Sequence, residues 1–141
     1  MDFASEMQER MKGFFPGTLG IRFVSVEPGR VVAELTARAA LCTVPGVLHG
    51  GAVMSLADTL GAIGTALNIP EGARTTTIES KTNFFGPGVE GTTITAECRP
   101  VHRGRRTQVW QTNVTSPDGR LLAQVTQTQF VDAPQSPGGG S

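Results

Sequence analysis

The chain has 141 residues, of which 38% are hydrophobic, and its 12 basic and 12 acidic residues give a formal net charge of zero. This length predicts one domain, and the charge balance argues against nucleic acid or an anionic membrane as a partner. No run reaches the ~18 apolar residues of a membrane span, and the first residues lack the apolar core of a signal peptide. Two cysteines, Cys42 and Cys98, match no disulfide framework or zinc spacing, so we expect a cytoplasmic protein without metal or cofactor.

The chain opens with a predicted amphipathic helix within residues 1–15. Apolar residues recur at helical spacing from Phe3 to Met11, and Gly13 and Pro16 stop the pattern. Two strands follow, over 18–27 and 30–38, and the second alternates between apolar and polar residues, which predicts a sheet with one buried face.

The run from 50 to 67 is too long for a strand and apolar nearly all round, which predicts a buried helix. Four further strands are expected, over 73–83, 91–102, 105–116 and 120–132. Because the connections are short, the strands must be largely antiparallel. The prediction is an α+β domain over 16–132, with an antiparallel sheet curved around one long helix and a flexible tail over 133–141.

One charged residue interrupts the predicted central helix: Asp58. A buried, unpaired carboxylate is costly, so it must be paired, neutralised or placed beside a cavity. A stripe of small and hydroxyl residues shares or borders its helix face, and it would leave room for a ligand; its members are Ser55, Thr59, Ala62 and Thr65. The alternative is a structural aspartate bound to an arginine or to backbone amides.

Gly50 and Gly51 follow His49 at the place where this helix must begin. The first N–H groups of a helix have no partner inside it, and glycine lets a ligand approach them closely. Such amides can form an oxyanion hole. The alternative is that these glycines only break the chain before the helix.

Gly50 and Asp58 are eight residues apart, which places them about 12 Å apart along a helix axis. One carbonyl group cannot contact both on the same helix, so a shared reaction centre requires two subunits. Gly61 and Gly64 each cost roughly 1 kcal/mol inside a helix, which predicts close backbone approach, with a partner chain as one candidate.

At this point the sequence resembles hot-dog-fold acyl-CoA thioesterases of the phenylacetate-degradation (PaaI-like) type, and the related 4-hydroxybenzoyl-CoA thioesterases. The resemblance covers roughly residues 15–132 and rests on four stretches: "PGVLHGGAVMSLADTLG", "NFFGPG", "RPVHRGRRT" and "SPDGRLLAQVTQT". It implies a hot-dog fold, homodimers whose sheets join, a homotetramer and hydrolysis of an acyl-CoA thioester. It also implies that the Gly50 amide binds the thioester oxygen, while Asp58 of the facing subunit acts as nucleophile or general base.

The resemblance extends to three supporting residues. His49 matches a histidine that supports the site, and Thr77 matches a hydroxyl residue that orients the attacking water in some members, although it also suits an ordinary strand. Thr43 stands where many members carry Asn or Gln, and its hydroxyl has a shorter reach. An Asp at 58 and an Ala at 62, in place of Glu and a following Thr, favour the phenylacetate-type branch.

Four arginines crowd the stretch "RPVHRGRRT", and guanidinium groups suit the phosphates of coenzyme A. The resemblance places residues around this turn near the nucleotide, and the predicted substrate contacts are Gly51, Arg103, Arg105, Arg106 and Thr107. A solvated hairpin tip is the alternative. Phe84 and Phe85 either line an acyl pocket or belong to the core, and aromatic or medium-chain acyl groups would suit such a pocket.

Two other functions compete with hydrolysis. "VPGVLHGG" has a passing similarity to acyl thioester dehydratases, but the His–acid arrangement of such a hydratase or dehydratase is not found. A non-catalytic acyl-CoA sensor is the other candidate, since fold does not determine function. A sensor would not need an acid within an apolar helix, so an enzyme is favoured.

Overall fold

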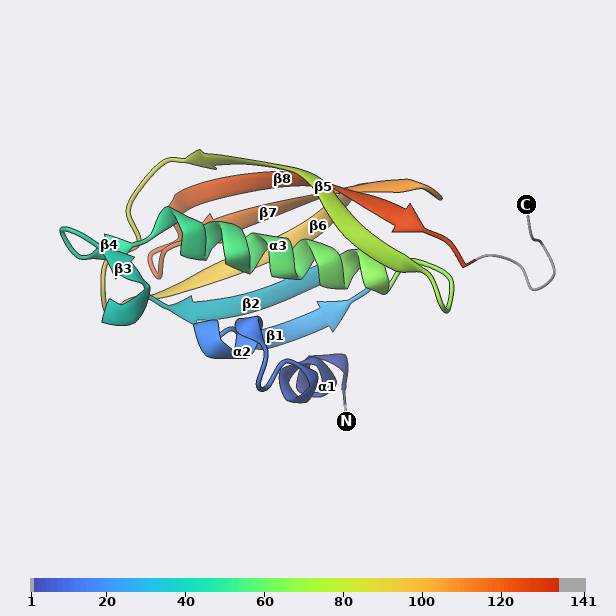
Figure 1. Ribbon diagram of the computed structural model, residues 1–141. Helices are drawn as coiled ribbons and strands as arrows, with labels where there is room; N and C mark the ends of the chain where they lie inside the picture. Colours follow the sequence, from blue (N-terminus) through green and yellow to red (C-terminus); the bar gives the residue numbers. More distant parts are fainter. Residues whose placement is uncertain (1, 135–141) are drawn as a thin grey trace.

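The computed structural model describes residues 2–134 and has one curved sheet around one long helix (Figure 1). Its helices are α1 (Phe3–Arg10), α2 (Phe15–Leu19) and α3 (Gly50–Ala66), with a 3-10 turn at Ala39–Leu41. Its strands are β1 (Arg22–Glu27), β2 (Arg30–Thr36), β3 (Cys42–Thr43), β4 (Val47–Leu48), β5 (Arg74–Phe84), β6 (Thr93–Arg103), β7 (Thr107–Thr115) and β8 (Leu121–Asp132). The predicted long helix and six long strands are confirmed.

Six strands form an antiparallel sheet in the order β1-β2-β6-β7-β8-β5, and α3 lies against one face of it. The sheet curves around α3, and α1 and α2 lie beside its β1 edge (Figure 1). The hot-dog architecture expected from the sequence is confirmed. No helix in the described part of the chain is long and apolar enough to cross a membrane.

Two short elements were not predicted. Pro16 was expected to end a helix, but it lies in the first turn of α2, where its missing N–H would have no partner in any case. As a result, α2 spans the domain boundary predicted at residue 15. β3 and β4 form a small hairpin with a cis peptide bond before Pro45. The predicted tail lies mostly in 135–141, outside the described residues.

Gly61 and Gly64 serve packing within the chain, not contact with a partner. A Cβ at Gly64 would lie 2.7 Å from the Trp110 ring, and a Cβ at Gly61 would overlap the Gln127 side-chain amide. Trp110 and Gln127 belong to β7 and β8 and are almost completely buried. The close approach that the sequence predicted is therefore the approach of α3 to its own sheet.

Asp58 is exposed in the single chain, so the prediction that it lies buried is wrong. α3 packs against the sheet through one face, where Leu56 and Leu60 are fully buried. Met54 and Asp58 lie on the exposed side of α3, called here the uncovered face, and Asp58 lies at its border, where it contacts Thr77 of the edge strand β5. The sequence pattern could not show which side of α3 is exposed, because apolar side chains occur on all sides of the helix.

β5 is an edge strand with a one-residue bulge at Ile78, between Thr77 and Glu79. Thr77 pairs with Gln129 and Phe84 pairs with Ala123. The two β8 partners are six residues apart and share a face, so Thr77 and Phe84 both face α3 although seven residues separate them. The bulge therefore lets one strand contact both ends of the site described below.

Candidate functional site

Asp58 is held from the sheet side by hydrogen bonds and not by an ion pair. The Thr77 hydroxyl lies 2.7 Å from Asp58 Oδ1 and can donate to it, and Gln127 Nε2 lies 3.5 Å from the same oxygen. Among residues 2–134, none of the ion pairs involves Asp58. The alternative of a structural aspartate clamped by an arginine is therefore not observed within the chain.

A groove of about 630 Å³ runs along the uncovered face of α3, beneath α1 and α2. The α3 residues that line it include Asp58, Thr59 and Ala62, and the opposite wall is mostly apolar: Met7, Arg10, Met11, Phe14, Phe15 and Pro16. This volume is in the range of small-molecule pockets. The stripe of small residues therefore borders a real cavity.

Two members of the stripe lie elsewhere. Thr65 is fully buried, and its hydroxyl donates to the Gly61 carbonyl at 2.8 Å. Ser55 lines a second, smaller cavity of about 230 Å³ together with His49 and Gly51. Phe15 lines both cavities, so the groove beside Asp58 and the cavity at the start of the helix are neighbours.

The start of α3 leaves one glycine amide available. His49 is the N-cap, and its Nδ1 accepts a hydrogen bond from the Gly51 N–H at 2.8 Å. Neutral His49 therefore carries its hydrogen on Nε2. No hydrogen bond among the described residues has the Gly50 N–H as donor. Of the two glycine amides predicted to bind substrate, Gly51 is used by the histidine and Gly50 is open.

Phe84 lies directly over this helix start. Its ring would be 3.0 Å from a Cβ built on Gly50. Phe84 and Phe85 are 52% and 59% exposed, so the alternative that they belong to the core is wrong. Phe84 borders the open amide, whereas Thr43 lies exposed in β3 and pairs with Val47.

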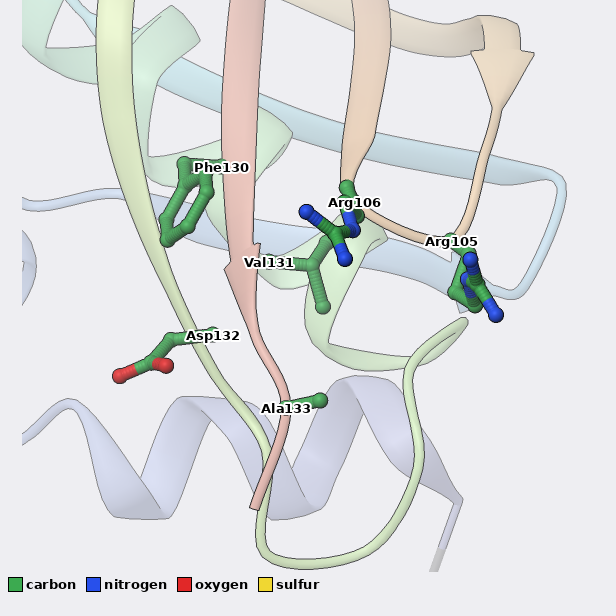
Figure 2. A pocket seen from close by; sticks show the side chains of 6 residues that line it. All are labelled: Arg105, Arg106, Phe130, Val131, Asp132 and Ala133. Carbon is green, nitrogen blue, oxygen red and sulfur yellow. The ribbon is translucent and has the colours of Figure 1, made fainter. Parts of the chain in front are cut away.

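The arginine cluster separates into two groups. Arg105 and Arg106, on the turn between β6 and β7, line a cavity of about 370 Å³ with the end of β8, including Phe130 (Figure 2). Arg103 instead points to the Pro28 carbonyl and the Asn68 side chain, at 3.5 and 3.4 Å. Thr107 is half-buried at the start of β7 and pairs with Phe130.

Sequence analysis missed Gln127 and Gln129, which reach the Asp58–Thr77 pair from β8. The alternation in "LLAQVTQTQF" could have identified them, because Gln127 and Gln129 share the strand face of Val125, which is buried. It also missed the role of α1 and α2 in closing the groove. No group of three or more His, Cys, Asp or Glu within residues 2–134 could hold a metal ion.

Comparison with known proteins agrees with this fold. Residues 45–123 match the thioesterase superfamily. Over 102 residues the chain is 36% identical to the proofreading thioesterase EntH of Klebsiella pneumoniae, covering 72% of this chain and 74% of that protein. It is 33% identical over 105 residues to the 1,4-dihydroxy-2-naphthoyl-CoA hydrolase of Listeria monocytogenes, covering 74% and 85%.

Solved structures share the whole fold. A Haemophilus influenzae thioesterase superposes with a TM-score of 0.88 at 24% identity, covering 94% of this chain and 92% of that one, which supports the fold alone. The Escherichia coli PaaI protein of the phenylacetic acid degradation operon gives 0.79 at 25% identity, covering 90% and 91%. A Streptococcus mutans protein bound to acetyl-CoA gives 0.75 at 28% identity, covering 82% and 91%.

The matching family and the similarity to named thioesterases and hydrolases identify a hydrolase of the thioesterase class. The chain belongs to the thioesterase superfamily, and the predicted resemblance to its PaaI-like members is confirmed.

Proposed function

We propose that this enzyme hydrolyses acyl-CoA thioesters at a site formed by two copies of the chain. The Gly50 N–H of one copy binds the thioester oxygen, and the partner's Asp58 attacks the carbonyl carbon or takes a proton from the attacking water. The main support is the open Gly50 amide at the N-terminus of the same helix that carries Asp58 beside a groove. α3 is continuous between them, so the estimate of about 12 Å still applies and both cannot serve one carbonyl within one copy.

The geometry of β5 supports this pairing. Phe84 contacts Gly50 and Thr77 contacts Asp58, so this edge strand passes both halves of the site. If two β5 strands pair antiparallel around a two-fold axis at Lys81, the bulge at Ile78 brings each Phe84 opposite the partner's Thr77. Each Gly50 then faces the partner's Asp58. The same pairing joins the two sheets into one.

The two cavities suggest how a substrate would lie. The mostly apolar groove beneath α1 and α2 would hold an aromatic or medium-chain acyl group beside Asp58. Arg105 and Arg106 would bind phosphate groups of coenzyme A in the cavity that Phe130 also lines. Relatives named as a CoA hydrolase and as an acetyl-CoA complex support coenzyme A as the carrier.

Complementation between two inactive variants tests the shared site. Asp58→Asn keeps the Gly50 amide, and Gly50→Pro removes the amide hydrogen at a helix position that suits proline. Each variant alone should be inactive. Co-refolded in equal amounts, half of the dimers are mixed and have one intact site, so about a quarter of native turnover should return.

Gly50→Ala is the matched control for proline, because it adds a carbon atom near Phe84 but keeps the N–H. It should retain most of the turnover. Absence of recovery in the mixture, with both variants folded and dimeric, would contradict the two-copy site.

A panel of CoA thioesters on the native enzyme tests the substrate class. If no aromatic or aliphatic thioester is hydrolysed, the non-catalytic acyl-CoA sensor is favoured. Addition of water to an enoyl-CoA without release of thiol would favour the hydratase.

A further inference from the structure

Two glutamines of β8 face Asp58 from the sheet and are almost completely buried. Gln127 is 1% exposed and Gln129 is 0% exposed. A buried amide is costly unless its polar atoms are hydrogen-bonded. Gln127 Nε2 donates to Gln129 Oε1 at 2.9 Å, and Gln129 Nε2 donates to Thr75 Oγ1 at 3.0 Å. These two bonds orient the Gln129 amide so that its oxygen faces Thr77.

The Thr77 hydroxyl therefore lies between two acceptors. Its oxygen is 2.7 Å from Asp58 Oδ1 and 2.5 Å from Gln129 Oε1. A hydroxyl has one hydrogen, so it donates to only one of these atoms at a time. Asp58 and Gln129 compete for the same hydrogen bond.

The charge of Asp58 decides this competition. When Asp58 is ionised, a charge-assisted bond to the carboxylate is roughly twice as strong as a neutral one, and Thr77 donates to Asp58. When Asp58 is protonated, that advantage is lost and Thr77 turns to the amide oxygen of Gln129. Asp58 can then donate its own hydrogen to Thr77 Oγ1, and the Thr77 hydrogen has an acceptor in both states.

We propose that Gln129 is a positioning residue that lets the Thr77 hydroxyl follow the charge of Asp58. This inference deepens the proposed function and rests on it for its catalytic meaning. Gln129 positions the hydroxyl by accepting the Thr77 hydrogen whenever Asp58 holds a proton. Gln127 holds Gln129 in place, and the missing side chain at Gly61 makes room for Gln127 against the helix.

The charged groups near Asp58 are the same in every variant used below except Gln129→Glu. Arg10 of α1 lines the same groove and is the charged residue there besides Asp58 itself. The residues of β5 and β8 that face α3 beside Asp58 are uncharged: Thr75, Thr77, Ser80, Gln127 and Gln129. Within α3 itself, Asp58 is the only charged residue.

The test is a titration of the Asp58 carboxyl by carbon-13 NMR in substrate-free protein, with the signal assigned from its loss in Asp58→Asn. In Gln129→Met, Thr77 donates only to Asp58 and Gln127 Nε2 loses its other acceptor. Both changes favour the ionised form, so the midpoint should fall by about one pH unit, the size of one hydrogen bond to a charge. In Thr77→Val the ionised form loses a donor, so the midpoint should rise by a similar amount.

Opposite shifts are the signature of this arrangement, since a general loosening of the fold would move both midpoints in one direction. Thr77→Ser restores the hydroxyl and should restore the native midpoint. Thr82→Val is the matched control, because Thr82 lies on the same face of β5 and its buried hydroxyl has no hydrogen-bond partner among the described residues. Gln124→Met is the second control, since Gln124 bonds to Asn113 and not to the site.

If Gln129→Met does not fold, Gln129→Glu provides the second variant. It places a negative charge beside Thr77 and should raise the midpoint, because two like charges disfavour ionisation of both. An unchanged or raised midpoint in folded Gln129→Met, or an unchanged one in Gln129→Glu, would overturn the inference. The titration uses no substrate, so its outcome is independent of turnover. If the proposed function is wrong, the native protein would still show the expected midpoints but would release no thiol from CoA thioesters.

Discussion

The two faces of α3 perform different tasks with similar residues. On the sheet face, Leu56 and Leu60 are fully buried, and Gly64 lies so close to Trp110 that no methyl group fits. On the uncovered face, Asp58 is exposed beside a groove of about 630 Å³. One face holds the fold together and the other carries the proposed chemistry, so substitutions on the two faces should affect stability and turnover separately.

The largest expected effect belongs to the uncovered face. Asp58→Asn keeps the size of the side chain but removes its charge and its capacity to act as base or nucleophile, so turnover should fall about 1,000-fold or more. The free energy of unfolding should change little, because Asp58 is exposed and takes part in no ion pair within the described chain. Thiol release and urea unfolding measure the two quantities. Substantial residual turnover by a folded variant would contradict the catalytic role of Asp58 and of the uncovered face.

The next effect belongs to the sheet face. Gly64→Ala should lower the free energy of unfolding by about 2 kcal/mol, because the new methyl group overlaps the Trp110 ring in a packed core and outweighs the gain in helix propensity. Urea unfolding measures the loss, and turnover per folded molecule should change little. The double variant with Trp110→Phe should be less destabilised than the sum of its parts. Strict additivity would show that the ring is not the obstacle.

Smaller effects should follow from residues outside both faces. Replacing Arg105 and Arg106 by alanine should raise KM about 10-fold for a CoA thioester and leave a pantetheine thioester unaffected, since two exposed charge pairs of about 0.7 kcal/mol each give about 1.4 kcal/mol, which is tenfold. Arg103→Ala is the matched variant, because its side chain points to Pro28 and Asn68 instead. It should not distinguish the two substrates. Equal effects of the double variant on both esters would contradict phosphate binding and favour the alternative of a solvated hairpin tip.

The smallest effect concerns a thiol beneath the helix. Cys98 is completely buried in β6, and burial raises the pKa of its thiol to about 11, so it stays protonated and unreactive at pH 8. Cys42 is half-exposed, with its pKa also raised by burial. A thiol reagent should label Cys42 slowly in the native protein and Cys98 only after unfolding. Equal labelling rates in the native state would mean that the sheet face opens readily.

Most of the architecture could be predicted because period and turn residues act locally. The alternation in residues 30–38 and the unbroken apolar run from 50 to 67 identified a strand and the central helix, and the short connections required antiparallel pairing. The small hairpin around Pro45 and the helix at Phe15–Leu19 were not predicted, since each is shorter than the window in which a period can be recognised. The bulge at Ile78 escaped because it depends on pairing with β8 and not on the local pattern.

By itself, the sequence determined the order of the elements, the position of one acid in an apolar helix and the glycines that open that helix. It did so because spacing along a helix or strand fixes which residues share a face. Only the tertiary structure decided that Asp58 faces an uncovered groove, that Gly61 and Gly64 pack against their own sheet, and that Gln127 and Gln129 meet Thr77. These are contacts between segments up to 69 residues apart, set by sheet curvature and strand register, which no local pattern encodes.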